Sequence, residues 1–81
     1  MNRLAWNVPI TVEDPLTGAP RTVKTVRQAQ TALHRNWPDT SGSRYRVAEA
    51  ACDDALHGET KADNARKAFI DAAIEAHLHL K

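Results

Sequence analysis

The first part of the chain alternates apolar and polar positions with a period of two. This pattern is typical of a β-strand with one buried face, and its apolar positions are Trp6, Val8, Ile10 and Val12. Pro9 lacks a backbone N–H and cannot donate to a sheet ladder, so we expect the strand to have a free edge there.

Residues 14–20, Asp-Pro-Leu-Thr-Gly-Ala-Pro, are turn-forming types almost throughout. The β-branched residues of the next segment, Arg21 to Val26, predict a second strand. Two strands joined in this way pair most naturally as an antiparallel hairpin, here with a loop somewhat longer than the tightest turns.

A first helix is predicted to begin at Thr25. Thr25 and Gln28 have the spacing of a capping box, in which each side chain satisfies a backbone N–H of the other residue. Pro38 ends this helix near Trp37, because the residue before a proline avoids helical geometry. The apolar positions at helical spacing are Val26, Ala29, Leu33 and Trp37.

A second helix is predicted from Ser43 or Arg44 to His57, after a polar loop over residues 39–43. Gly58 stands where a helix commonly ends in a left-handed residue, and His57 suits the negative end of the helix dipole. The apolar stripe is narrow and consists of Tyr45, Ala48, Ala51, Cys52, Ala55 and Leu56.

A third helix is predicted from about Lys61 to Leu78, with Thr60 as its N-cap. Its inner face consists of Ala62, Ala65, Phe69, Ala72, Ala73 and Ala76, widened to the side by Ile70, Ile74, His77 and Leu78. This apolar arc is broader than contact with one neighbouring helix requires. We therefore expect a second contact surface here, covered by another subunit.

These elements predict an α+β protein of order ββααα, in a single domain that spans residues 1–81. Leu, Ile, Val and Phe together account for only 15 of the 81 residues, whereas alanine alone accounts for 14, so the core must be small and closely packed. The expected core residues are Trp6, Val8, Ile10, Val23, Val26, Leu33, Trp37, Cys52, Leu56 and Phe69.

Several short motifs follow one another in a distinctive order. They are the strand from Trp6 to Val12, Trp37-Pro38, Ala48-x-x-x-Cys52-x-x-Ala55-Leu56-x-Gly58, and Ala65-Arg66-x-Ala68-Phe69-x-x-Ala72-x-x-Glu75-Ala76. In this order and spacing, the chain resembles the small bacterial proteins grouped as domain of unknown function 982. The resemblance covers nearly the whole chain and implies one compact domain. It implies no catalytic residue, and it leaves the function open.

Cys52 is the only cysteine, which excludes an intrachain disulfide and a cysteine pair for zinc. A nucleophilic thiol needs a lowered pKa, but the neighbouring Asp53 and Asp54 raise the pKa of a thiol. His57 lies about 140° around the helix from Cys52, which is unsuitable for a base. We therefore expect a packing residue, with a reactive thiol as the alternative.

The remaining polar residues form no recognisable catalytic or metal site. His77 and His79 point about 200° apart on a helix, so one metal ion cannot bind both unless the terminus is extended. His34 and His57 could in principle join them, but no acidic or cysteine ligand cluster with zinc spacing accompanies these histidines. Adjacent carboxylates diverge, and the three glycines are isolated, so no phosphate-binding loop is present. We expect no catalytic residues, no metal and no cofactor, and thus a protein that is not an enzyme.

Charge is distributed unevenly although the net charge is only +1. Residues 1–46 contain seven basic and three acidic residues, whereas residues 47–81 contain four basic and seven acidic ones. The basic half suggests contacts with nucleic-acid phosphates or with a protein partner, and Trp37 and Tyr45 would stack on bases. The candidate contact residues are Arg21, Lys24, Arg27, Arg35, Arg44 and Arg46.

The function predicted from the sequence is therefore that of a small non-enzymatic binding or regulatory module. A two-stranded hairpin is marginal alone and leaves unpaired edges, so self-association into a homodimer or contact with another protein is expected. Nucleic-acid binding through the basic residues is the alternative. No signal-peptide pattern or membrane-spanning run is present, so we expect a cytoplasmic protein without membrane contact.

Overall fold

The computed structural model describes residues 4–14, 17–35, 37–38, 40–78 and 80. It confirms the predicted α+β class and the order ββααα. The elements are β1 (Ala5–Glu13), β2 (Pro20–Thr25), α1 (Val26–His34), α2 (Ser43–Leu56) and α3 (Ala62–Glu75). Some residues of the predicted turn, the polar loop, the charge count and the histidine pair lie outside the described residues. They are Arg3, Pro15, Leu16, Asp39, His79 and Lys81.

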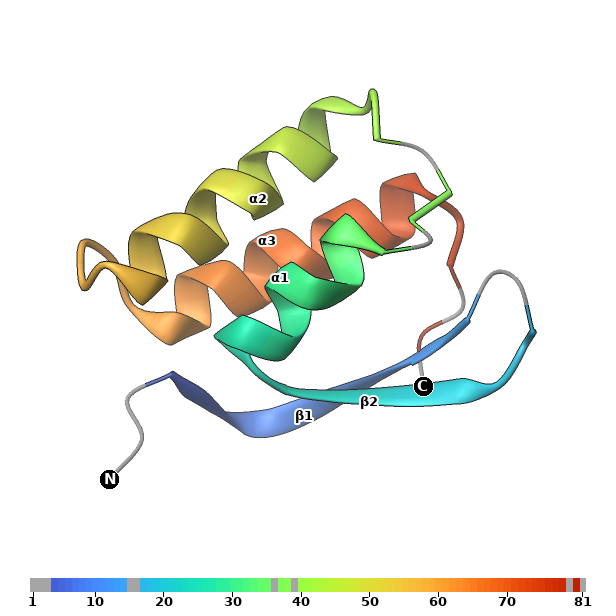
Figure 1. Cartoon of the computed structure of the whole chain (residues 1–81), viewed down its shortest axis with the longest axis horizontal. Helices are drawn as coiled ribbons and strands as arrows, with labels where there is room; N and C mark the ends of the chain where they lie inside the picture. Colours follow the sequence, from blue (N-terminus) through green and yellow to red (C-terminus); the bar gives the residue numbers. More distant parts are fainter. Residues whose placement is uncertain (1–3, 15–16, 36, 39, 79, 81) are drawn as a thin grey trace.

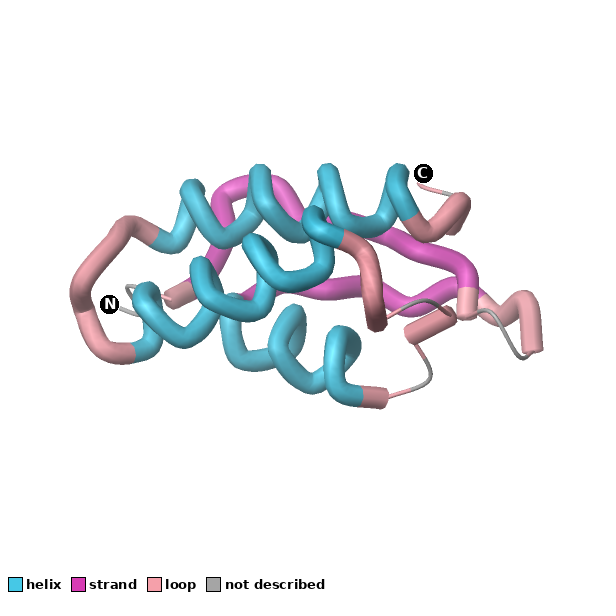
Figure 2. The backbone as a smooth tube through the Cα atoms, turned by 90° about the horizontal axis from the view of Figure 1, so that it is seen from above, coloured by secondary structure: helices cyan, strands magenta, loops and turns pink. Residues whose placement is uncertain are grey.

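The molecule has two layers, a twisted two-stranded ribbon and three helices that cover one face of it (Figure 1). Seen from above, the helices lie over the strands (Figure 2), and the side view shows no helix of the described residues on the opposite face of the ribbon (Figure 1). The single core therefore lies between the layers, and its size is limited by the width of two strands.

The two strands pair as an antiparallel hairpin, as predicted from their sequences. Ile10 lies opposite Val23, but the next pair that forms is Ala5 opposite Thr25, so β1 contains more residues than β2 between these rungs. β1 therefore contains a bulge between Ala5 and Ile10.

The bulge corrects one predicted core residue. Val8 is 59% exposed and does not belong to the core, because the period-two pattern applies only to a regular ladder. Pro9 lies in the same irregular segment, as expected of a residue that cannot donate to the ladder. The Val8 carbonyl oxygen instead accepts a hydrogen bond of 2.8 Å from Nε of Arg66 on α3.

The outer edge of β1 is closed further along by the end of the chain. Leu80 forms an isolated antiparallel bridge with Val12, after α3 has ended. This contact also explains why the third helix stops at Glu75 and not at the predicted Leu78. His77 adopts a left-handed conformation (φ 60°), which turns the chain back towards β1.

α1 begins as predicted and ends early. The Thr25 hydroxyl accepts from the backbone N–H of Gln28 at 3.1 Å, and the Gln28 carboxamide oxygen accepts at 2.7 Å from the N–H of Lys24. The capping box is thus shifted by one residue from the expected N–H of Thr25. The helix ends at His34, so the prediction that it continues to Trp37 is wrong.

α2 and α3 pack side by side, and a carboxylate of α3 caps the start of α2. Glu75 accepts from the backbone N–H groups of Arg44 and Tyr45 at 3.1 and 3.4 Å. Gly42, the N-cap residue, has no side chain, and a Cβ at this position would overlap the Glu75 carboxylate. A residue from another helix therefore supplies the cap that the local sequence lacks.

α3 begins at Ala62 with Lys61 as its N-cap, so Thr60 is not the N-cap, although its hydroxyl accepts from the Asn64 carboxamide at 2.6 Å. At the end of α2, Gly58 has the predicted left-handed conformation (φ 78°).

The core is centred on Phe69, which is fully buried. Its ring lies 5.9 Å from Trp6 of β1 and 5.5 Å from Trp37, the residue that follows the end of α1. Of the ten predicted core residues, seven are buried and two are partly buried against the core. The buried residues are Trp6, Ile10, Val23, Val26, Leu33, Cys52 and Phe69; the partly buried ones are Trp37 and Leu56.

Candidate functional site

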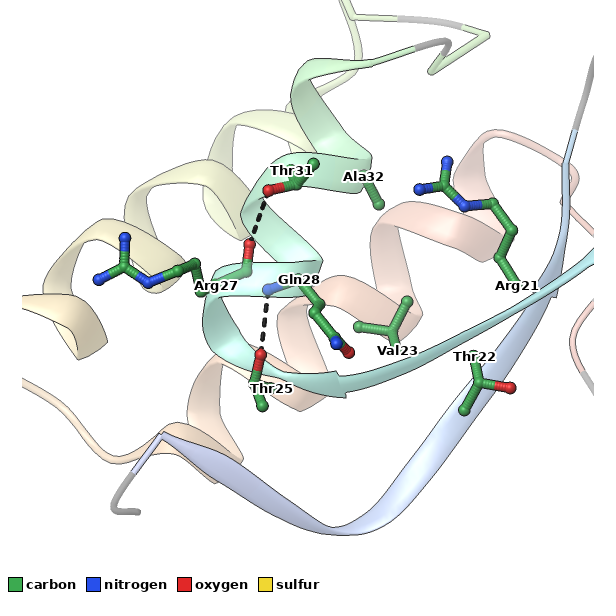
Figure 3. Close-up of a pocket in the computed structure, with 8 residues that line it drawn as sticks. All are labelled: Arg21, Thr22, Val23, Thr25, Arg27, Gln28, Thr31 and Ala32. Atoms are coloured by element: carbon green, nitrogen blue, oxygen red, sulfur yellow. Dashed lines mark hydrogen bonds between the residues drawn. The ribbon is translucent and has the colours of Figure 1, made fainter.

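A groove lies between β2 and the start of α1, with a volume of about 470 Å³. It forms because Thr25 ends the strand and caps the helix, so the two elements meet at an angle without an intervening loop. We call it the β2/α1 groove; its lining residues are Arg21, Thr22, Val23, Thr25, Arg27, Gln28, Thr31 and Ala32. Figure 3 shows Arg27 and Arg21 at opposite ends of the groove, with Gln28 and Val23 between them.

The polar groups that line the β2/α1 groove are mainly hydrogen-bond donors. Arg21 and Arg27 each present a guanidinium, which can only donate. The oxygen of the Gln28 carboxamide is engaged by Lys24, so its NH₂ group remains for a ligand. The Thr25 hydroxyl accepts from the helix and keeps its hydrogen to donate. Such a set of donors suits a ligand rich in acceptors, such as carboxylates or phosphates.

The charges of the groove are poorly neutralised by the protein itself. None of the described residues that line it is acidic. Arg21 lies 3.9 Å from the largely buried Asp14 carboxylate, at the outer limit of an ion pair, and Arg27 has no ion-pair partner among the described residues. In addition, Arg27 lies in the first turn of α1, where a cation opposes the positive end of the helix dipole. An anionic ligand would offset both effects.

The six basic residues singled out from the sequence do not form one continuous face. Only Arg21 and Arg27 line the β2/α1 groove. Arg35 lines a neighbouring recess together with Arg21 and Trp37. Lys24 alternates with the buried Val23, which directs its side chain away from the helices. The last two, Arg44 and Arg46, lie in the first turns of α2.

Arg46 belongs to a different electrostatic environment. It lines a hollow between α1 and α2 that also contains two carboxylates, Glu49 and Asp53. Glu49 lies 3.2 Å from Nε2 of His34, so α1 and α2 are also joined by a polar contact. Glu49 and Asp53 lie four residues apart on α2, and each has a histidine neighbour, His34 and His57 respectively.

The two aromatic residues considered as base-stacking platforms are engaged inside the protein. Tyr45 is buried, and its hydroxyl donates to the Leu33 carbonyl at 2.9 Å. Burial and the nearby Glu49 carboxylate raise the pKa of Tyr45. Trp37 is half-buried between the rings of Tyr45 and Phe69, at 6.3 and 5.5 Å. Neither ring is an open platform on the surface.

Cys52 lies in the core, and burial raises the pKa of its thiol to about 11. A thiol with this pKa is almost entirely protonated at neutral pH and is a poor nucleophile. The expectation that Cys52 is a packing residue agrees with its burial.

His57 lies at the end of α2 and is fully exposed. Its Nδ1 lies 2.8 Å from the Asp53 carbonyl oxygen. This hydrogen bond, followed by the charge of the Asp53 carboxylate, raises the pKa of His57. The predicted position of His57 at the negative end of the helix dipole also favours a raised pKa.

Within the described residues, no group of three or more His, Cys, Asp or Glu side chains is arranged to hold a metal ion. In the same part of the chain, no helix has the length and apolar character needed to span a bilayer.

The polar residues that line the β2/α1 groove were not predicted from the sequence as part of a site. The sequence indicates a helix cap at Thr25 and Gln28 and a strand at Thr22, and it gives no role to Thr31, whereas all four residues line the groove. The signal that indicates a groove is the direct passage from a strand to a capped helix, because both walls then come from one continuous segment, residues 21–32.

Comparison with protein families matches the chain to the model described as protein of unknown function (DUF982), over residues 8–80. No curated protein and no solved structure shows significant similarity to the chain. The match includes both strands and all three helices except the first residues of β1, and it agrees with the resemblance found in the sequence motifs. The chain therefore belongs to the DUF982 family of proteins of unknown function.

Proposed function

We propose that the protein is a small non-enzymatic binding module whose β2/α1 groove takes an acidic segment of a partner protein. The observation that carries this proposal is the composition of the groove: two guanidinium groups stand at its ends, and no carboxylate of the described residues lines it. Guanidinium groups pair with carboxylates in a planar, bidentate geometry, which gives both affinity and orientation.

Nucleic-acid binding is the alternative that the basic residues also suggest. Proteins that hold single strands combine cations with aromatic rings on which bases stack. Here Trp37 and Tyr45 pack against the core, and the cations of α2 lie apart from the groove. The geometry therefore favours a carboxylate-bearing protein segment over a nucleic acid.

Self-association is a second candidate, favoured by one observation on α3. Ile74 is 60% exposed, although it follows the half-buried Ile70 on the side of the helix that the sequence marked as surplus apolar surface. Sedimentation velocity over the micromolar range tests it. A species of twice 9.0 kDa would support a homodimer, and a monomer at every concentration would contradict it.

The proposed location is the cytoplasm. Its support is chemical: the one cysteine is an unpaired thiol, which suits a reducing compartment. Tagging the protein in its own cells and following it by fractionation tests this, and recovery in an extracytoplasmic fraction would contradict it.

Fluorescence anisotropy tests the proposed groove directly. The probe is an N-acetylated, C-amidated peptide of four Glu-Thr repeats, compared with an eight-residue oligothymidylate of similar size. We expect the peptide to bind, with an affinity that falls as salt increases. The double variant Arg21→Gln/Arg27→Gln should lower its affinity about tenfold or more, which is about 1.4 kcal/mol.

The matched control is Arg44→Gln/Arg46→Gln, which removes the same charge outside the groove. It should leave peptide affinity within about threefold of the parent. Equal losses in the two double variants would mean that net charge alone drives binding, which would contradict the proposal. Tighter binding of the oligonucleotide than of the peptide would replace it by the nucleic-acid alternative.

A further inference from the structure

We infer that the acidic segment binds as an additional β-strand on the free edge of β2, an inference that rests on the proposed function of the β2/α1 groove. Strand addition uses the backbone groups of a sheet edge for affinity and alternate side chains for specificity. The register of the hairpin shows which backbone groups of β2 are free for pairing and which of its side chains face the groove.

The direction of the backbone groups of β2 follows from one hydrogen bond. The N–H of Lys24 donates to the Gln28 side chain and therefore points away from β1. Along a strand, residues two apart direct their backbone groups to the same edge, so the N–H and C=O of Thr22 also point away from β1. No described residue pairs with these two groups, and Thr22 lines the groove.

Gln28 acts as a substitute for a neighbouring strand at the end of this edge. Its carboxamide oxygen takes the place of a strand carbonyl opposite Lys24, at 2.7 Å. The part of the edge that stays open is therefore short. It consists of both groups of Thr22 and of the Pro20 carbonyl, because proline has no N–H to offer.

Two kinds of strand could pair with this edge, a second copy of β2 or an acidic segment of a partner, and the charge of β2 distinguishes between them. A second copy of β2, paired antiparallel about Thr22, would bring the two Arg21 side chains together as diagonal neighbours on one face of the sheet, where their like charges repel. Cations on an edge strand are a known protection against such self-pairing. An acidic segment meets the same cations with opposite charge, so it is the occupant that the edge favours.

An extended acidic segment also fits the side-chain requirement of the groove. Arg21 lies on the same face of β2 as the buried Val23, the face that carries the helices, and Arg27 projects from the first turn of α1 (Figure 3). An added strand directs every second side chain to this face. Alternate acidic residues would therefore reach both guanidinium groups, while the intervening residues face solvent.

Backbone methylation of the probe peptide tests strand addition separately from charge. One variant of the Glu-Thr peptide carries N-methyl groups on all Glu residues, and the other carries them on all Thr residues. In an added strand only one of these two sets of N–H groups faces β2. We expect one variant to bind about tenfold or more weakly than the parent peptide and the other to remain within about threefold.

Two outcomes separate this inference from the proposed function. If both methylated peptides bind alike while Arg21→Gln/Arg27→Gln still weakens binding about tenfold or more, strand addition is wrong and the acidic groove stands. If the parent peptide does not bind, the proposed function fails, and the inference falls with it.

A protein variant gives the complementary test. Thr22→Pro removes the free N–H, and because this N–H is not part of the ladder with β1, proline is tolerated there. It should weaken the parent peptide about tenfold, whereas Thr22→Val, which keeps the N–H, should not. Thermal melts verify that both variants fold. A dimer of the parent protein that Thr22→Pro converts to monomer would show that the occupant is a second copy and overturn the choice of an acidic segment.

Discussion

The two edges of the hairpin differ in how far the protein satisfies them itself. The outer edge of β1 is closed from two sides: Arg66 donates to the carbonyl of Val8 in the bulge, and Leu80 bridges to Val12. Among the described residues, only the Gln28 side chain pairs with the edge of β2, opposite Lys24, and Thr22 remains open beside two guanidinium groups.

Within this small sheet, the closed edge of β1 contributes to stability and the open edge of β2 is the one proposed to bind a partner. Unpaired backbone groups invite pairing with other chains, so proteins usually cover or protect a sheet edge. Here one edge is covered by α3 and the chain end, and the other is protected by positive charge. A charged edge repels copies of itself and still accepts a strand of opposite charge, which makes it selective.

The largest effect is expected from a substitution in the core that supports both edges of the hairpin. Phe69→Ala takes away the ring that contacts Trp6 under β1 and Trp37 beside the groove. It should lower the free energy of unfolding by about 3–5 kcal/mol, enough to threaten folding in a chain of this size. Urea or thermal unfolding measures the change. A variant that melts like the parent would mean that the core is assigned wrongly.

A smaller change affects the β2 side alone. Thr25→Val keeps the shape of the side chain and removes the hydroxyl that accepts from Gln28. Loss of an N-cap costs about 0.5–2 kcal/mol, and it should also disturb the groove and weaken the acidic peptide. Chemical denaturation and anisotropy on the same sample measure both. Unchanged peptide affinity at reduced stability would separate the cap from the groove.

The matched change on the β1 side is Arg66→Met, which keeps most of the apolar stem and removes the hydrogen bond to Val8. It should cost about 0.5–1.5 kcal/mol of stability. Peptide affinity should not change, because Arg66 belongs to α3 and is not one of the residues that line the groove. A loss of affinity here would mean that the two edges are not independent.

The smallest effect is expected for His57, which lies at neither edge of the hairpin. The pKa of His57 is raised above its ordinary value of 6.5 by the Asp53 carbonyl and the nearby carboxylates. Its contribution to stability is therefore complete below about pH 6.5 and is lost as the pH rises through the higher folded-state pKa. His57→Gln should flatten this part of the stability–pH profile and leave peptide binding unchanged. An NMR titration that finds the pKa of His57 below 6.5 would contradict it.

The fold was largely predictable because its signals are local. Alternation in β1, the Thr25 cap, the Gly58 end of α2 and the alanine stripes each depend on residues near in sequence. The errors arise where distant residues decide. Val8 leaves the core because of a bulge, α3 ends early because Leu80 returns to β1, and α2 is capped by Glu75.

The candidate site was predicted only in part for the same reason. Charge counting identified the basic half of the chain, but it cannot tell which cations share a surface. The fold places Arg21 and Arg27 in one groove and Arg46 beside two carboxylates. Thr22 carries no charge, and its role depends on the direction of its backbone N–H, which only the register of the hairpin defines.

Amide hydrogen exchange along the hairpin tests the central claim most directly. The exchange of individual N–H groups is followed by NMR with and without the Glu-Thr peptide. The account predicts that the peptide slows exchange at Thr22 on the β2 edge and leaves Thr11 of β1 unchanged. Unaltered exchange at Thr22 under saturating peptide, or equal slowing in both strands, would contradict it.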